Sequence, residues 1–239
     1  MRAVTSFKIL VAAVSLASTT AFADQVRVKI ENLTSQMYFT PVLAVAHSPQ
    51  LKLFRTGEPA SAGLQAIAEG GDISIAKAAV ENAGAATAAA DGLLAPGESV
   101  TLVLNTRRWQ RYLSLAGMLL PTNDGFAGID SIRIPWGRRA ISTYARGYDA
   151  GTEMNNEVVN GGGAPGVLGI PADPGGNAGT GGSGVTTTEN NVVHVHRGVL
   201  GDRDATGGES DLDSSVHRWL NPVARITVYN IPRRGGGNR

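Results

Sequence analysis

Apolar and polar residues alternate over several short stretches of the chain. The clearest case is residues 26–31, where Val26, Val28 and Ile30 are each followed by a charged residue. Because successive side chains of a β-strand point to opposite faces, this pattern predicts a half-buried strand. Further strand-like runs recur along the chain, at residues 37–46, 99–104, 112–120, 129–134, 140–144, 192–196 and 223–231.

The segments between these runs show no sustained helical periodicity. Residues 63–82 are rich in Ala and are compatible with short helical turns, whereas residues 83–90 are nearly all small and are interpreted as a loop. Pro96-Gly97 predicts a turn before the strand at 99–104. Many short strands separated by turn signals, without a βαβ rhythm, predict an all-β sandwich or barrel.

One segment has a very different composition. Residues 161–184 contain 11 of the 31 glycines and three prolines. Such a segment buries too little apolar surface to offset its ordering entropy, so it is interpreted as a flexible Gly-rich loop. The chain after it is too short for a second core, and the strand at 223–231 needs a sheet to join. The sequence therefore predicts a single domain over residues 24–239.

Residues 1–23 have the features of a cleavable export signal. Arg2 and Lys8 precede a short apolar run, and Ala21-Phe22-Ala23 matches a small-x-small cleavage site. Cleavage before Asp24 lowers the count of Lys and Arg from 21 to 19 against 20 acids, which changes the net charge from +1 to −1. The predicted location is secreted or periplasmic, without a transmembrane segment.

The cysteine content and the charge balance limit the possible classes of function. The chain has no Cys, so an exported form depends on core burial and on any bound ions for its stability. A near-neutral balance of charges does not predict binding to nucleic acid, which needs a concentrated basic surface.

Two loops carry carboxylates in a suggestive arrangement. Asp149 and Glu153 flank Ala150-Gly151-Thr152, and Asn123-Asp124-Gly125 lies in an earlier turn. Hard cations such as calcium take six to eight oxygen ligands at about 2.3–2.6 Å, which carboxylates on bendable loops can supply. The alternative is that these are ordinary turn residues, because Asp and Asn favour turns through local hydrogen bonds.

Several segments, in order, resemble the spondin domain family. The first half of that domain resembles the stretch from Ala46-His47-Ser48-Pro49 to Ala68-Glu69-Gly70. Its central strand and Ser-Pro-Asp-Trp segment resemble residues 119–128, and its Trp-Asp-Ala-Gly-Thr-Asp motif resembles residues 148–153. Residues 222–226 and Arg233-Arg234-Gly235 resemble its closing strand and basic tail.

The resemblance implies a C2-like antiparallel β-sandwich of about eight strands with loops gathered at its ends. In the animal family the domain carries calcium on three Asp residues, whose positions match Asp124, Asp149 and Glu153 here. Those proteins bind extracellular-matrix, cell-surface or microbial partners. The resemblance thus implies an exported calcium-binding module for recognition or adhesion rather than an enzyme. The animal partners do not carry over, and the partner expected here is an unidentified extracellular or envelope ligand, either a glycan or a protein.

The chain departs from the family pattern near this site. Glu153 replaces the last Asp and is one methylene longer, and Gly125 replaces a Trp that would pack beside the site. The family's cysteines and the Ser-Pro before Asp124 are absent, and the Gly-rich loop has no recognised counterpart.

Two other groups of residues are candidate metal ligands. Residues 202–213 partly match the ligand positions of an EF-hand loop, but no amphipathic helices flank them, so a solvated acidic loop is the preferred interpretation. His194 and His196 share one strand face and would chelate zinc if His217 or His47 came near. A zinc-dependent hydrolase is therefore an alternative function, and an ion-free structural domain of the cell envelope is another.

The remaining candidates have a structural interpretation. His47-Ser48 lies in no Gly-x-Ser-x-Gly turn, and adjacent strand residues point to opposite faces, so catalysis is not predicted there. Trp109, Trp136 and Trp219 are spread along the chain and are interpreted as core or corner residues.

Overall fold

The computed structural model describes residues 24–176, 178–186 and 191–231. The predicted export signal and Arg233-Arg234-Gly235 lie outside the described residues. The described part contains two helices, α1 (Ala62–Gly70) and α2 (Ser74–Asn82), and ten strands. The strands are β1 (Asp24–Asn32), β2 (Tyr38–Phe39), β3 (Leu43–His47), β4 (Ala86–Ala89), β5 (Ser99–Thr106), β6 (Tyr112–Leu120), β7 (Gly125–Arg133), β8 (Ala140–Asp149), β9 (His194–Val195) and β10 (Ala224–Ile231).

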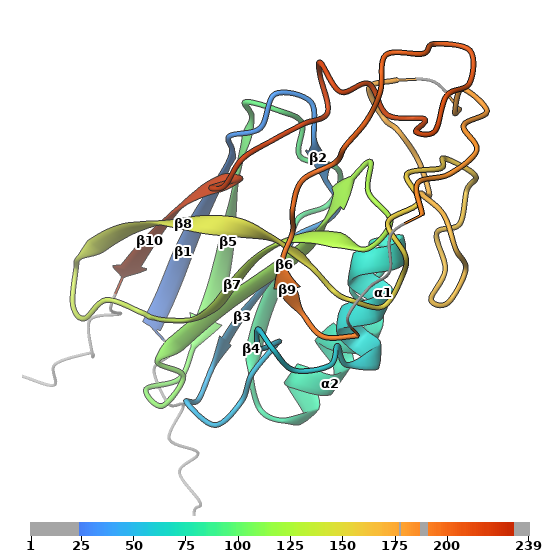
Figure 1. Cartoon of the computed structure of the whole chain (residues 1–239). Helices are drawn as coiled ribbons and strands as arrows, with labels where there is room; N and C mark the ends of the chain where they lie inside the picture. Colours follow the sequence, from blue (N-terminus) through green and yellow to red (C-terminus); the bar gives the residue numbers. More distant parts are fainter. Residues whose placement is uncertain (1–23, 177, 187–190, 232–239) are drawn as a thin grey trace, which may run out of the picture.

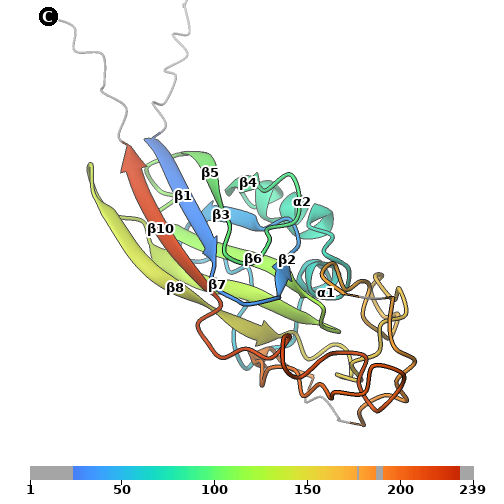
Figure 2. The same ribbon diagram turned by 90° about the horizontal axis from the view of Figure 1, so that it is seen from above.

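All named strand pairs are antiparallel and belong to one curved sheet. The strand order is β4-β3-β6-β7-β8-β10-β1-β5, with β2 beside β6 and β9 beside β8. The two ends of this order also meet, because β5 contacts β4 and β3. The sheet therefore folds over itself, with β1, β5 and β10 forming one layer (Figures 1 and 2).

The main core fills the inside of the folded sheet. Val26, Val28 and Ile30 of β1 are fully buried there, as their alternation with charged residues predicts. They pack with apolar side chains of the neighbouring strands β5 and β10 and of the facing layer. Burying each large aliphatic side chain contributes about 1.5–3 kcal/mol, so this cluster is a principal source of stability.

A second cluster covers the outer face of β3, β6 and β7. Strand β3 is buried on both faces, with Leu43 and Val45 directed into this second cluster. Helices α1 and α2 supply its cover (Figure 1). Ser61 caps the start of α1 by accepting a hydrogen bond from the Leu64 N–H, and Gly71 ends it in the left-handed conformation. The short helical turns expected over 63–82 are thus two nine-residue helices.

The interpretation of residues 83–90 as a loop was wrong. Residues 86–89 form β4, which pairs with β3 at the edge of the sheet. Their Ala and Thr side chains carry no strong strand signal, so the neighbouring β3 backbone and the packing against α2 determine the structure.

The all-β fold class is confirmed, although the sheet has ten strands rather than about eight. The strand predicted at 112–120 coincides with β6, whereas the run at 192–196 yields only the two-residue β9. Neither helix of the described residues has the length and apolarity needed to cross a membrane.

Candidate carboxylate site at one end of the sheet

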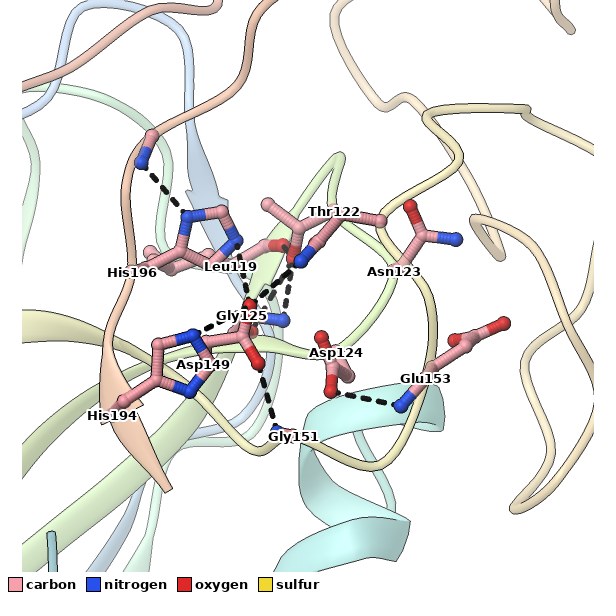
Figure 3. Close-up of polar contacts among 12 residues, drawn as sticks. Leu119, Thr122, Asn123, Asp124, Gly125, Asp149, Gly151, Glu153, His194 and His196 are labelled. Carbon is pink, nitrogen blue, oxygen red and sulfur yellow. Dashed lines mark hydrogen bonds and ion pairs between the residues drawn. The ribbon is translucent and has the colours of Figure 1, made fainter. Parts of the chain in front are cut away.

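The carboxylate loops meet at the end of the sheet where β7 begins and β8 ends. Gly125 pairs with Asp149 in the β7–β8 register, and the Ala150 N–H donates to the Asp124 carbonyl at 3.1 Å. The Thr122 hydroxyl closes the preceding turn, because it accepts a hydrogen bond from the Gly125 N–H at 3.0 Å and donates to the Leu119 carbonyl. Sheet pairing therefore brings the two predicted loops together (Figure 3).

The Asp124 carboxylate holds the second loop in place. It is fully buried, and its Oδ2 accepts hydrogen bonds from the backbone N–H groups of Thr152 at 2.9 Å and Glu153 at 3.1 Å. Backbone donors that converge on a carboxylate favour its charged form. Asp124 thus joins the start of β7 to the loop that follows β8.

Asp149 organises the turn of its own loop. Its Oδ1 accepts from the Gly151 N–H at 2.8 Å, and its Oδ2 accepts from the Asn155 side-chain amide at 2.7 Å. Gly151 has a φ of 67°, and a Cβ there would lie 2.5 Å from the Val192 carbonyl oxygen. Only glycine fits this turn, because any side chain would meet the backbone that leads into β9.

The third predicted ligand, Glu153, points away from Asp124 (Figure 3). Its Oε1 accepts a hydrogen bond from the Gly169 N–H in the Gly-rich loop, while its buried Oε2 has no hydrogen-bond partner. Burial raises the pKa of Glu153 to about 8, and the charges of Glu69 and Asp124 add to this effect. The structure thus brings Asp124 and Asp149 together and directs Glu153 toward another loop.

His194 of β9 and His196, which follows this strand, approach Asp149 on the side opposite Glu153 (Figure 3). Their Nε2 atoms lie 3.8 and 3.9 Å from the Asp149 Oδ2. The two rings do share one face, as predicted, but neither suggested third ligand is present. His47 pairs with the Ser114 hydroxyl at 2.8 Å, and His217 lies 3.6 Å from Asp173.

The hydrogen bonds of the two rings differ in a way that matters for metal binding. His194 Nδ1 lies 2.9 Å from the Val192 carbonyl oxygen and so carries the proton, which makes its Nε2 the basic nitrogen. His196 Nδ1 instead accepts from the Gly198 N–H at 2.9 Å, so its proton is on Nε2. Burial lowers the pKa of His196 to about 3, with the charge of Arg197 contributing, so this ring is neutral. A protonated Nε2 cannot ligate zinc.

The ring of His196 also explains Gly125, which stands where the resemblance has Trp. A Cβ at Gly125 would lie 2.6 Å from the Thr122 hydroxyl oxygen and 3.1 Å from the His196 ring. The Trp219 ring also packs against the His196 ring, with the ring centroids 4.9 Å apart. Residues from the C-terminal part of the chain therefore fill the space beside Gly125.

A further layer of polar side chains supports the loops. The Asn123 side chain donates to Asn156 Oδ1 at 2.7 Å and accepts from the Glu157 N–H at 3.0 Å. The buried Glu157 carboxylate accepts from the N–H groups of Leu200 and Gly201 and from the Ser210 hydroxyl. Asn155 and Glu157 were not predicted to support the site. The sequence around a polar loop residue does not indicate which distant backbone group it will bind.

The loop at residues 202–213 is built by local turns. Asp202 Oδ2 accepts from the N–H groups of Glu209 and Ser210, and these bonds lower its pKa. Asp204 and Asp213 each bind a hydroxyl and an N–H two residues ahead. These hydrogen bonds fit the preferred interpretation of a solvated acidic loop.

Other predicted residues have simpler positions. His47 is fully buried, which lowers its pKa, and its Nδ1 bonds to the Ser48 carbonyl. Trp109 and Trp136, interpreted as core or corner residues, lie outside the core, where they are 44% and 64% exposed on loops. These loops bend away from the core, and Arg111 lies over the Trp136 ring, 3.3 Å from its centroid.

The donor chemistry of Asp124, Asp149 and Glu153 suits a hard cation, because all three offer only oxygen. Within the described residues, however, no group of three or more His, Cys, Asp or Glu side chains is arranged to hold a metal ion. The trio would need the Glu153 carboxylate to leave Gly169 before it could join the other two.

These features define an all-β domain that gathers buried carboxylates in the loops at one end of its sheet. A family model described as Spondin_N matches residues 27–156, more than half of the chain, and the chain belongs to this spondin N-terminal domain family. The match includes Asp124, Asp149 and Glu153 and ends before the Gly-rich loop, β9 and β10. No curated protein matches the chain.

Proposed function

We propose that this chain is an exported recognition or adhesion domain whose carboxylate loops bind calcium. Membership of the spondin N-terminal family supports an extracellular module of the adhesion type, and that family is not known for enzymes. The observation that carries the calcium proposal is the meeting of two buried Asp residues, Asp124 and Asp149, next to a loop in which the buried Oε2 of Glu153 has no hydrogen-bond partner.

In this proposal Asp124, Asp149 and Glu153 hold the ion. Calcium supplies positive charge that offsets the repulsion among these buried carboxylates. The chain's own residues position the loop around the ion. The Gly151 turn sets the direction of the loop, and Asp124 ties Thr152 and Glu153 to the start of β7. The loop surface presented to a partner then depends on the ion.

Calcium titration at pH 8.5 tests the proposal, because Glu153 is mostly ionised at that pH. Extracellular calcium sites have dissociation constants of about 10⁻⁴–10⁻³ M, so 10 mM calcium should stabilise the protein by roughly 1.4–2.7 kcal/mol. We expect a rise in Tm, and a calorimetric binding signal that Asp149→Ala removes. Asp130→Asn is the matched control, since Asp130 is an exposed acid on β7 that pairs with Lys52. Absence of binding at millimolar calcium, or unchanged binding in Asp149→Ala, would contradict the site.

The zinc hydrolase alternative rests on one observation, the approach of both imidazoles to Asp149. The proton on His196 Nε2 weighs against it. Metal analysis of protein purified without chelators separates the two proposals. Stoichiometric zinc that is lost in His196→Ala would favour the hydrolase, and no Tm change with either metal would favour an ion-free structural domain.

A further inference from the structure

A groove of about 690 Å³ lies at the opposite end of the sheet from the carboxylates. Arg27 and Lys29 of β1 line one side, Arg138 and Arg139 of the β7–β8 loop line the other, and Tyr229 of β10 lies between them. Strand β8 starts at the groove and ends at Asp149. At about 3.3 Å per residue, this strand separates the two sites by roughly 30 Å. The β7–β8 loop projects at the left of Figure 1.

The sheet register builds the groove from distant parts of the sequence. Tyr229 pairs with Arg27 on one side and with Ala140 on the other, so these side chains share the outer face. The Asn230 N–H donates to the Arg139 carbonyl at 3.2 Å, and the Asn230 side chain donates to the Pro135 carbonyl at 2.8 Å. These two bonds fix the β7–β8 loop against β10, so the groove is preformed.

The groove is basic and has no acidic lining residue. Arg27, Arg138 and Arg139 form no ion pair with any described residue, while Lys29 lies 3.2 Å from Glu31. The surrounding loops are also crowded with cations. The pKa of Arg111 is lowered by burial and by the nearby charges of Arg133 and Arg108, which outweigh the attraction of Asp24. In a chain whose net charge is +1, or −1 after the predicted cleavage, such a concentration marks a site of attraction for anions.

Aromatic side chains accompany the cations. Tyr229 is 42% exposed within the groove, on the outer face of β10. A flat ring beside positive charges offers an apolar face for stacking and leaves the guanidinium groups to bind anions in pairs of parallel hydrogen bonds.

We propose that this groove binds an acidic polysaccharide, one whose sugar units carry sulfate, phosphate or carboxylate groups. Arg27, Arg138 and Arg139 would bind the anionic groups, and Tyr229 would stack on a sugar ring. The cations lie on both sides of Tyr229, an arrangement that suits a single extended chain of charged sugars. Membership of an extracellular family favours a glycan over a nucleic acid. This site shares no residue with the proposed calcium site.

The test measures binding of the full mature chain to dextran sulfate, with neutral dextran as the uncharged control and EDTA present throughout. The double variant Arg27→Ala/Arg139→Ala removes two groove cations. Its matched control is Arg55→Ala/Lys77→Ala, which removes two exposed cations near the helices. We expect the groove variant to lose about tenfold or more in affinity and the control to lose less than twofold. Binding should also weaken steeply with salt.

A third variant separates sugar recognition from charge alone. Tyr229→Thr keeps a strand-forming residue, and it should weaken binding to dextran sulfate several-fold while leaving binding to sugar-free polyphosphate unchanged. The proposal is overturned if the two double variants lose affinity equally, or if no binding occurs at 50 mM salt. It is also overturned if anionic phospholipid vesicles or a single-stranded oligonucleotide bind as tightly as dextran sulfate. Because EDTA is present, failure here leaves the calcium proposal unaffected, and a missing calcium site leaves this result unaffected.

Discussion

The three carboxylates at the end of β7 and β8 have unequal environments. Asp124 accepts hydrogen bonds from backbone N–H groups of the loop that follows β8, and Asp149 accepts from backbone and amide groups of its own loop; such bonds favour the charged state of a carboxylate. Glu153 has one bonded oxygen and one buried oxygen without a hydrogen-bond partner, beside other negative charges. Its extra methylene lets it reach Gly169, which a shorter Asp side chain would approach less closely.

This difference predicts a pH effect on the metal-free protein. The folded pKa of Glu153 is about 8, above its ordinary value of 4.5, so the folded state keeps a proton that the unfolded state releases. Between these two values the free energy of unfolding therefore falls as pH rises. Glu153→Gln removes this loss and keeps an oxygen for Gly169. In EDTA we expect the variant to match the wild type near pH 5 and to exceed it by a few degrees in Tm at pH 8.5.

Glu81→Gln serves as the control, because Glu81 is exposed on α2 and its removal should not produce a pH-dependent gain. A Tm difference for Glu153→Gln that is the same at pH 5 and pH 8.5 would show that the carboxyl ionises normally in the folded state.

Local spacing alone left Asp124 and Asp149 open to interpretation as ordinary turn residues, and it was the family resemblance that placed them in one site. It could not reveal the orientation of Glu153. That orientation depends on Gly169, which lies 16 residues further on in a segment without any periodic pattern. The approach of His196 to Gly125 was equally hidden, since it depends on how β9 adds to β8.

At the scale of elements, the Gly-rich segment makes several specific contacts. Glu69 of α1 and Glu153 accept hydrogen bonds from the N–H groups of Gly166 and Gly169. Ile170 is fully buried in a small cluster with Val199 and Leu212. The segment thus connects α1, the carboxylate site and the loops before β10.

Because its small cluster is separate from the main core, we predict that the segment unfolds separately from the sheet. Ile170→Ala removes most of the side chain at the centre of the small cluster. Such truncations typically lower the free energy of unfolding of the affected region by about 2–5 kcal/mol. We expect faster hydrogen exchange at residues 158–170 and 199–212, with little change in global Tm. The matched variant Ile226→Ala, in the main core, should lower the global Tm by several degrees. Equal drops in global Tm would show that the segment folds together with the sheet.

The elements that the sequence predicted best are those with strong alternation, such as β1 and β6. Strand β4 was missed because its Ala-rich sequence gives no preference, and its partner β3 imposes the extended form. Residues 62–82 form helices because their apolar residues cover β3 and β6, a tertiary effect that the short Ala-rich pattern did not display.

At the scale of the whole molecule, charge is divided between the two ends of the sheet. The loops at 107–111 and 133–139 carry six arginines and no acid. The described part of residues 150–217, at the carboxylate end, carries eight acids against two arginines. The near-neutral net charge of the chain, from which binding to nucleic acid was not predicted, conceals this division.

The two ends should act independently. Their separation of roughly 30 Å exceeds the Debye length of about 8 Å at physiological ionic strength several times over. We expect saturating calcium to change the affinity for dextran sulfate by less than twofold at 0.15 M salt, measured by titration with calcium and with EDTA. A change of fivefold or more would reveal coupling through β7 and β8 instead.

The pairing of Gln25 with Ile231 places the first and last described strands side by side at the arginine-rich end (Figure 2). A purification tag or a surface attachment placed directly before Asp24 or directly after Ile231 would therefore start next to the groove, at the end of the sheet opposite the carboxylate loops. Immobilisation through such a tag would lower the measured binding of anionic ligands at the groove. The response to calcium would be unchanged. Attachment through an engineered residue on α2 would leave both ends of the sheet equally accessible to a partner. The orientation of the immobilised molecule is therefore a variable to control in any search for its partner.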